Sequence, residues 1–92
     1  MFHAYIVQCS NGSYYVGHTH NLVARIQDHN TGKGALHTST RRPVRLVYSE
    51  AHPNESEAIG QELQIKKWSR EKKKALIEGS KDRLHELSKS HD

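Results

Sequence analysis

Two short aromatic segments separated by an Asn-Gly dipeptide constrain this chain more than any other feature. Residues 2–9 and 13–17 are rich in aromatic and β-branched side chains, as β-strands are. Between them stands Asn11-Gly12, the strongest short-range signal for a β-hairpin, because glycine readily takes the positive φ that such turns need. The pattern predicts an N-terminal hairpin that brings Tyr5 and Tyr15 onto neighbouring strands.

The first strand has two different faces. Alternation places three side chains on each face, Phe2, Ala4 and Ile6 on one and His3, Tyr5 and Val7 on the other. We expect helices to cover the first face and leave the polar-aromatic face for function.

The segment 19–30 has the period of an amphipathic helix, with Thr19 or Asn21 as its N-cap. Its apolar stripe contains two polar residues, Arg25 and His29. The members of the stripe, spaced i, i+3, i+4 and i+7, are Leu22, Arg25, Ile26 and His29. An arginine there either meets an anion or carboxylate, or lies at the edge of the stripe with its head group in water.

Residues 31–35 contain too much glycine for regular structure and predict a loop. The loop lacks the spacing and the Lys-Ser/Thr ending of a Walker P-loop. Four basic side chains in and after it can face a phosphate chain, although a solvated loop explains the composition equally: Lys33, His37, Arg41 and Arg42.

Residues 43–50 alternate as a third strand, with Pro43 acceptable at its start. A long helical connection lets this strand join the hairpin. Three strands need a cover of helices, so the expected fold class is α+β, a small three-stranded antiparallel sheet flanked by three or more helices.

A second polar residue falls in an apolar helical stripe beyond Asn54, which begins a capping box with Glu57. The stripe consists of Ala58, Ile59, Glu62, Ile65 and Lys66. Glu62 should therefore point inward, where a carboxylate must be paired, protonated or bound to a cation. An ion pair with Arg25 and a bound metal ion both satisfy that requirement.

The chain after residue 67 predicts a helix break with Ser69 as the next cap and Gly79 as a C-terminal stop. The lysines at 72–74 form a solvated face or a phosphate-contacting patch. We expect one domain over residues 1–79 and an extension over 80–92, with a short helix at 80–88 and frayed final residues.

Composition narrows the classes of function. The 92 residues suit one modest core, and the net charge of +4 favours polyanionic partners. The single cysteine, Cys9, excludes an intramolecular disulfide and a cysteine-based zinc site, and the spacing of the eight histidines matches no zinc motif. No apolar run is long enough for a membrane span, so a cytoplasmic protein without membrane contact is expected.

Five features together resemble the GIY-YIG nuclease family, most closely its small single-domain bacterial members, over residues 5–76. The features are Tyr15-Val16-Gly17 in the second strand, Arg25 with His29, the Gly32-Lys33-Gly34 loop, Arg41-Arg42-Pro43 before a strand, and Glu62 before Ile65-Lys66. The chain departs from the family pattern in two places. It has His3-Ala4-Tyr5 where the family has Gly-Ile-Tyr, and His18 where many members carry lysine.

The resemblance implies a metal-dependent endonuclease that hydrolyses DNA phosphodiester bonds, with DNA repair or processing among its roles. Tyr5 would be the general base or orient the water, with Tyr15 and His29 as hydrogen-bonding neighbours. Arg25 would bind the phosphate, and Glu62 would hold a single Mg²⁺ or Mn²⁺ ion. The DNA contacts that we predict are His18, Lys33, His37, Arg41, Arg42 and Lys66.

Two alternatives stay open. The altered His3-Ala4-Tyr5 segment and the lack of a second domain favour a non-catalytic nucleic-acid-binding module on the same fold. A protein-interaction domain would show no salt-dependent affinity for DNA. The sequence leaves a protein partner open.

Overall fold

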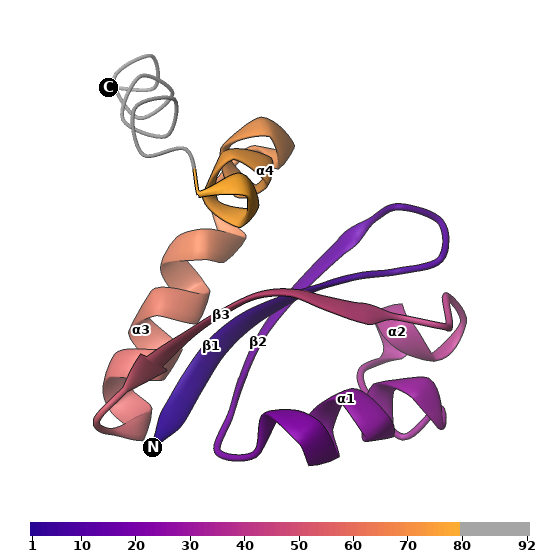
Figure 1. Ribbon diagram of the computed structural model, residues 1–92, viewed down its shortest axis with the longest axis horizontal. Helices are drawn as coiled ribbons and strands as arrows, with labels where there is room; N and C mark the ends of the chain where they lie inside the picture. Colours follow the sequence, from indigo (N-terminus) through magenta and orange to yellow (C-terminus); the bar gives the residue numbers. More distant parts are fainter. Residues whose placement is uncertain (80–92) are drawn as a thin grey trace.

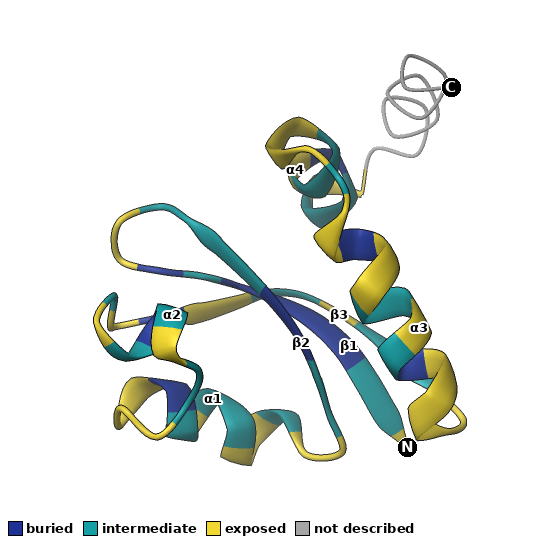
Figure 2. Cartoon of the chain, turned by 180° about the vertical axis from the view of Figure 1, so that it is seen from behind, coloured by how far each residue is buried: buried dark blue, intermediate teal, exposed yellow. Residues whose placement is uncertain are grey.

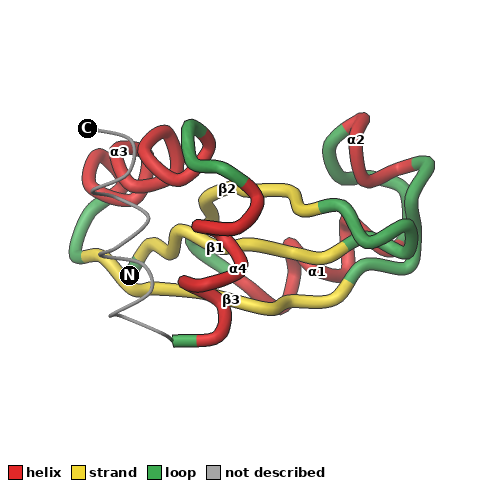
Figure 3. Tube along the Cα trace, turned by 90° about the horizontal axis from the view of Figure 1, so that it is seen from above, coloured by secondary structure: helices red, strands yellow, loops and turns green. Residues whose placement is uncertain are grey.

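The computed structural model describes residues 1–79; the helix expected at 80–88 lies outside the described residues. Its centre is a three-stranded antiparallel sheet of β1 (Phe2–Gln8), β2 (Tyr14–Thr19) and β3 (Arg45–His52), in the order β2-β1-β3. The central position of β1 between the other strands is visible in Figure 3. The N-terminal hairpin and the third strand are therefore confirmed.

Within residues 1–79 four helices accompany the sheet: α1 (Leu22–Asn30), α2 (Leu36–Ser39), α3 (Glu55–Lys66) and α4 (Arg70–Glu78). Figure 1 shows α1 and α2 on one side of the sheet and α3 and α4 on the other. The predicted α+β class is confirmed. None of the helices within residues 1–79 has the length and apolar character needed to cross a membrane.

Our expectation that helices cover only one face of the sheet was wrong. Successive residues of β1, from Ala4 to Val7, are all completely buried, and Figure 2 shows this strand as the most deeply buried element. Tyr5 and Val7 pack against Leu22 and Ile26 of α1. The opposite face carries a second cluster, in which Ile6, Val16 and Ile65 pack with Trp68 and Leu76. Because both faces of β1 are apolar, both need a cover.

The hairpin turn sets the register of the two tyrosines. The Cys9 amide donates to the Ser13 carbonyl at 2.8 Å, and Gly12 has φ 86°. The register then pairs Tyr5 with Gly17 and Val7 with Tyr15. Tyr5 and Tyr15 therefore lie on the same face, diagonally across the strand pair.

The predicted helix caps are confirmed. Asn21 caps α1, Asn54 caps α3 and Ser69 caps α4, each with a side-chain oxygen that accepts an amide hydrogen of the first turn. Gly79 ends α4 in the left-handed conformation, with φ 74°.

The bounds of all three strands differ from those expected. β1 ends one residue earlier, at Gln8, and β2 covers Tyr14–Thr19 instead of 13–17, so it continues past Gly17. The third strand begins at Arg45 and ends at His52, two residues later than predicted at each end. The residues before it are held by Asn30, whose side chain accepts from the Val44 amide at 2.7 Å and donates to the Val44 carbonyl at 3.1 Å. The short helix α2 was not predicted, because it is a single turn without an amphipathic pattern.

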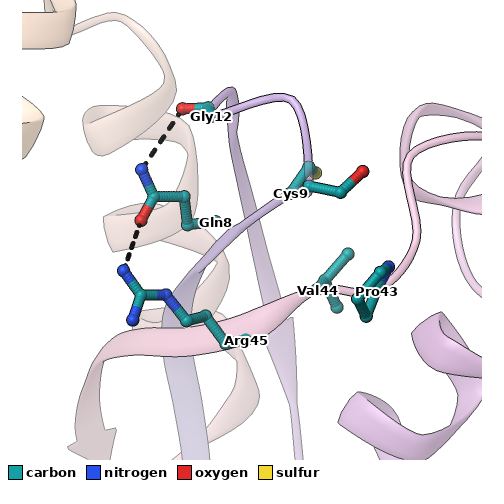
Figure 4. A pocket seen from close by; sticks show the side chains of 7 residues that line it. Gln8, Cys9, Gly12, Pro43, Val44 and Arg45 are labelled. Atoms are coloured by element: carbon teal, nitrogen blue, oxygen red, sulfur yellow. Dashed lines mark hydrogen bonds between the residues drawn. The ribbon is translucent and has the colours of Figure 1, made fainter.

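A polar side chain links the hairpin to β3. Gln8 donates through Nε2 to the Gly12 carbonyl at 3.4 Å and accepts at Oε1 from Arg45 at 3.0 Å (Figure 4). The hollow beside these bonds is lined in part by Cys9 and Val44, which belong to the core. These bonds join the turn end of the hairpin to the start of the third strand.

Candidate active site

A buried tyrosine hydroxyl forms the centre of the candidate site. Tyr5 is completely buried, and its hydroxyl lies 2.9 Å from Nε2 of His29. Nε of Arg25 donates to the same hydroxyl at 3.3 Å. Arg25 and His29 are one turn apart on α1, which packs on the Tyr5 face of the sheet. The structure thus brings together three of the predicted catalytic side chains.

Gly17 makes room for this hydroxyl. The residue pairs with Tyr5 across the hairpin, and a Cβ atom at position 17 would lie 2.6 Å from the Tyr5 hydroxyl oxygen. Any larger residue would push the ring away from His29. Gly17 lies within β2 and does not end the strand as expected, and it is a packing requirement of the tyrosine.

His29 is held from its other side by a threonine that sequence reasoning missed. Nδ1 of His29 lies 2.7 Å from Oγ1 of Thr38, and that hydroxyl donates to the Ala35 carbonyl at 3.0 Å. Both His29 and Thr38 are completely buried. Thr38 follows His29 by nine residues in a short helix of no marked pattern, so no periodicity in the sequence indicates the contact.

Tyr15 lies between two histidine rings. Its ring meets His29 edge-on, with centroids 5.3 Å apart, and stacks on His37 at 6.1 Å. Nε2 of His37 lies 3.0 Å from Oγ of Ser13, whose hydroxyl lies 2.7 Å from the Asn11 side chain. His37 is thereby fixed against the hairpin.

Burial moves the pKa values of the proton-transfer groups in opposite directions. Burial raises the pKa of Tyr5 above its ordinary value, although Arg25 opposes the change. Burial and the positive charge of Arg25 lower the pKa of His29. Burial also lowers the pKa of Arg25, but the hydrogen bonds and charges of Tyr5 and Tyr15 together outweigh burial, and the pKa is raised. At neutral pH, Tyr5 keeps its proton and His29 is neutral.

Glu62 projects from α3 toward β2, and its side chain is 12% exposed. Its Oε1 lies 2.7 Å from Nδ1 of His18, and its Oε2 accepts from Lys66 at 2.8 Å. Within residues 1–79 Glu62 forms no ion pair with Arg25, so that alternative was wrong. The two residues lie on helices that pack on opposite faces of the sheet.

The charge state of Glu62 follows from these partners. Burial raises the pKa of the Glu62 carboxyl, but the hydrogen bonds and charges of Lys66 and His18 together outweigh burial and hold the pKa below its ordinary value. The carboxylate is close enough to Tyr5 to contribute to the raised pKa of that residue. Glu62 is therefore ionised at neutral pH, and its charge acts on Tyr5 from the other side of the sheet.

The predicted DNA contacts differ in how they are held. Arg41 donates to the His37 carbonyl at 2.7 Å, and Arg42 donates to the carbonyls of Ser39 and Asn30 at 3.1 and 3.3 Å. Both guanidinium groups therefore brace the loop that carries α2. Lys33 is exposed, and no hydrogen bond or salt bridge involves its side chain in the described part of the chain.

The donor set limits the metal that the site can hold. Among residues 1–79, no three or more His, Cys, Asp or Glu side chains are grouped as metal ligands. Glu62 is the carboxylate whose charge acts on Tyr5, and the more exposed Glu55 lies 3.9 Å from the other ring nitrogen of His18. Mg²⁺ commonly binds one or two carboxylates and completes its shell with water and substrate phosphate. A single ionised carboxylate at a partly open surface fits that mode.

We expect Gly34→Ala to destabilise the protein by about 1–3 kcal/mol, as overpacking does. A Cβ atom at position 34 would overlap Nδ1 of His29 and lie 2.9 Å from the Cα of that residue. Gly60→Ala is the matched control. A Cβ atom at position 60, in the middle of α3, would meet nothing within 4 Å beyond the backbone of its own helix, so alanine there should stabilise the helix by about 0.5–1 kcal/mol. Urea unfolding measures both changes, and equal effects of the two variants would contradict the packing of Gly34 on His29.

The pH dependence of stability should reveal the buried His29. Its folded pKa is lowered below the ordinary 6.5, so between the two values the unfolded chain binds more protons. The free energy of unfolding should therefore fall as pH decreases from 7 through 6.5 toward 5. We expect a smaller decrease in the free energy of unfolding for His29→Gln when urea unfolding is measured at pH 7 and at pH 5. The same decrease in both proteins would mean that His29 is not held neutral by the fold.

A family model described as the GIY-YIG catalytic domain matches residues 1–75. The chain belongs to the GIY-YIG family, whose domain is of nuclease type. A UPF0213 protein from Staphylococcus haemolyticus is 51% identical over 76 residues, which cover 83% of this chain and 93% of that protein. A UPF0213 protein from Staphylococcus aureus is 49% identical over 73 residues, 79% of this chain and 89% of the relative.

A solved structure supports the fold. The solution NMR structure of a UPF0213 protein from Bacillus halodurans is similar to this chain with a TM-score of 0.56 and 41% identity. The match covers 87% of this chain and 86% of that one. The resemblance to small single-domain bacterial members of the family is therefore confirmed.

Proposed function

We propose that this protein is a divalent-metal-dependent endonuclease that hydrolyses phosphodiester bonds of DNA. One observation carries the proposal: a single tyrosine hydroxyl is hydrogen-bonded to an imidazole and to a guanidinium group. Phosphodiester hydrolysis needs an activated water molecule, stabilisation of charge on the phosphoryl oxygens and help for the leaving oxygen. Tyr5 and its neighbours supply groups for the first two tasks.

Tyr5 and His29 would activate the water molecule through a coupled proton transfer. Because burial raises the pKa of Tyr5, a free tyrosinate is costly at neutral pH. The hydroxyl oxygen would accept a proton from the attacking water while its own proton passes to Nε2 of His29, over the 2.9 Å bond. The water oxygen then bonds to phosphorus, the bond to the leaving oxygen breaks, and the leaving oxygen takes a proton from solvent.

Arg25 would bind the phosphate and open the path to Tyr5. In the described part of the chain no carboxylate lies within salt-bridge distance of its guanidinium group. Its charge is therefore not neutralised by an ion pair and suits a phosphate oxygen. Tyr5 is completely buried with Arg25 bound to its hydroxyl, so water reaches that oxygen only when the arginine turns toward the substrate.

Glu62 would hold the Mg²⁺ or Mn²⁺ ion. Its low pKa keeps the carboxylate charged at neutral pH, and Lys66 and His18 orient both of its oxygens. A metal ion at this carboxylate would stabilise negative charge on the phosphoryl oxygens.

The DNA backbone would follow the basic residues around this site. The chain carries a net charge of +4, and phosphate contacts from lysine and arginine account for most sequence-independent affinity. Lys33 is the exposed member of the predicted set that no other described residue holds. The other proposed contacts are His18, His37, Arg41, Arg42 and Lys66.

A non-catalytic nucleic-acid-binding module is the second candidate. The complete burial of Tyr5 favours it, because a hydrolytic tyrosine must meet water at some stage. Such a module would bind DNA with the salt dependence of phosphate contacts but would not cleave it.

The deciding experiment is a cleavage assay on single-stranded, duplex and branched DNA with Mg²⁺, with Mn²⁺ and with chelator. A Tyr5→Phe/Glu62→Gln double variant purified in parallel controls for contaminating nuclease. Metal-dependent cleavage by the wild type alone supports the enzyme. DNA binding that weakens with salt, without cleavage on any substrate, supports the binding module.

A further inference from the structure

Thr38 is a buried polar residue that has no role in the function proposed above. It belongs to α2, and its side chain is completely enclosed. Oγ1 of Thr38 lies 2.7 Å from Nδ1 of His29 and 3.0 Å from the Ala35 carbonyl oxygen, to which it donates. Buried hydroxyl groups are normally hydrogen-bonded, so this geometry satisfies Thr38 without a ligand.

Only one placement of the hydrogen atoms gives every donor in this series of hydrogen bonds an acceptor. Arg25 can only donate, so Tyr5 accepts at its oxygen and needs an acceptor for its own hydrogen. Among the described residues, Nε2 of His29 is the acceptor within reach. If Nε2 carried the proton instead, the hydroxyl of Tyr5 would receive two donors and its buried hydrogen would have no acceptor. His29 must therefore carry its proton on Nδ1.

The proton on Nδ1 in turn requires an acceptor. The Thr38 oxygen accepts it, because the single hydroxyl hydrogen of Thr38 is directed at the Ala35 carbonyl. The resulting order of donation runs from Arg25 to Tyr5, His29, Thr38 and Ala35. Every donor in this series has an acceptor, and the lone pair on Nε2 faces Tyr5.

We propose that Thr38 is a positioning residue that fixes the Nδ1–H tautomer of His29 and so directs a proton-accepting nitrogen at Tyr5. Its catalytic consequence rests on the proposed function, whereas the tautomer does not. When His29 takes the proton of Tyr5, both ring nitrogens become donors, and Thr38 remains an acceptor for the Nδ1 hydrogen. Thr38 never exchanges a proton with substrate.

The tautomer can be measured directly. In ¹⁵N NMR spectra of uniformly labelled protein, the imidazole nitrogen shifts report which nitrogen of His29 carries the proton. We expect Nδ1–H in the wild type and in Thr38→Ser, which keeps the hydroxyl. Thr38→Val keeps the shape but loses the acceptor, so its spectrum should move toward Nε2–H. Nε2–H in the wild type, or Nδ1–H unchanged in folded Thr38→Val, would overturn the proposal.

Cleavage kinetics provide a second measurement. We expect Thr38→Val to lower kcat roughly 10- to 100-fold with little change in KM, and Thr38→Ser to restore most of kcat. An unchanged kcat in Thr38→Val would overturn the positioning role. If the wild type does not cleave DNA but shows the Nδ1–H tautomer, the proposed function fails while the tautomer assignment is supported.

Discussion

Replacement of Glu62 by Gln is expected to lower metal-dependent DNA cleavage by roughly 10²–10³-fold, the range typical of a lost charge-stabilising group. The amide keeps the shape and one acceptor oxygen but loses the negative charge that would hold Mg²⁺ or Mn²⁺. The Lys66 partner is 46% exposed, so loss of that ion pair should change the stability by about 1 kcal/mol or less. Single-turnover cleavage at saturating Mg²⁺, with thermal unfolding alongside, separates the two effects.

Glu57→Gln is the matched control for this substitution. Glu57 is an exposed carboxylate in the first turn of the same helix, and its side chain takes part in no salt bridge in the described part of the chain. Its replacement removes the same charge from α3 without touching the site. A Glu62→Gln variant as active as Glu57→Gln would remove Glu62 from the proposed metal site.

Replacement of Tyr5 by Phe should abolish most cleavage, with a loss of roughly 10²–10⁴-fold, as for other general acid–base groups. The ring remains buried over Gly17, so the fold should persist. The loss of the hydroxyl leaves His29 and Arg25 each without one partner, which should cost about 1–3 kcal/mol of stability. Cleavage rates and urea unfolding curves of the same preparations test both statements.

Tyr14→Phe controls for the loss of a tyrosine hydroxyl from the hairpin. Tyr14 lies on the same strand as Tyr15, its ring packs beneath Arg70, and no hydrogen bond to its hydroxyl occurs within residues 1–79. We expect its cleavage rate to match the wild type. If Tyr5→Phe cleaves as fast as Tyr14→Phe, the coupled proton transfer is wrong even if the protein is a nuclease.

The two variants separate the parts of the mechanism. Glu62→Gln removes a charge on α3, and Tyr5→Phe removes a proton-transfer group on the opposite face of β1 and β2. A protein that loses activity only in Glu62→Gln would use its metal without the tyrosine. Loss in both would support the coupling of the charged carboxylate and the tyrosine in one reaction.

Local features of this protein could be predicted because neighbouring residues control them. The turn at Asn11-Gly12 depends on the backbone freedom of one glycine, and the caps Asn21 and Ser69 bond to amides three residues away. The amphipathic stripe of α1 likewise placed Arg25 and His29 on one helical face. The resemblance to the GIY-YIG family then related these local features to a common fold, which the family match confirms.

Tertiary structure alone decided how the polar residues pair. Whether Glu62 meets Arg25 or His18 depends on which face of the sheet α3 covers, and the helical stripe of Glu62 carries no information about that face, whereas its pair with Lys66 is a local i, i+4 contact within the helix. Thr38 reaches His29 only because the loop at Gly34 turns back over the imidazole ring. Contacts between residues that are far apart in the sequence depend on the packing of whole elements, and no local pattern encodes them. The sequence by itself therefore determined the elements of the site, and packing determined which of its hydrogen bonds form.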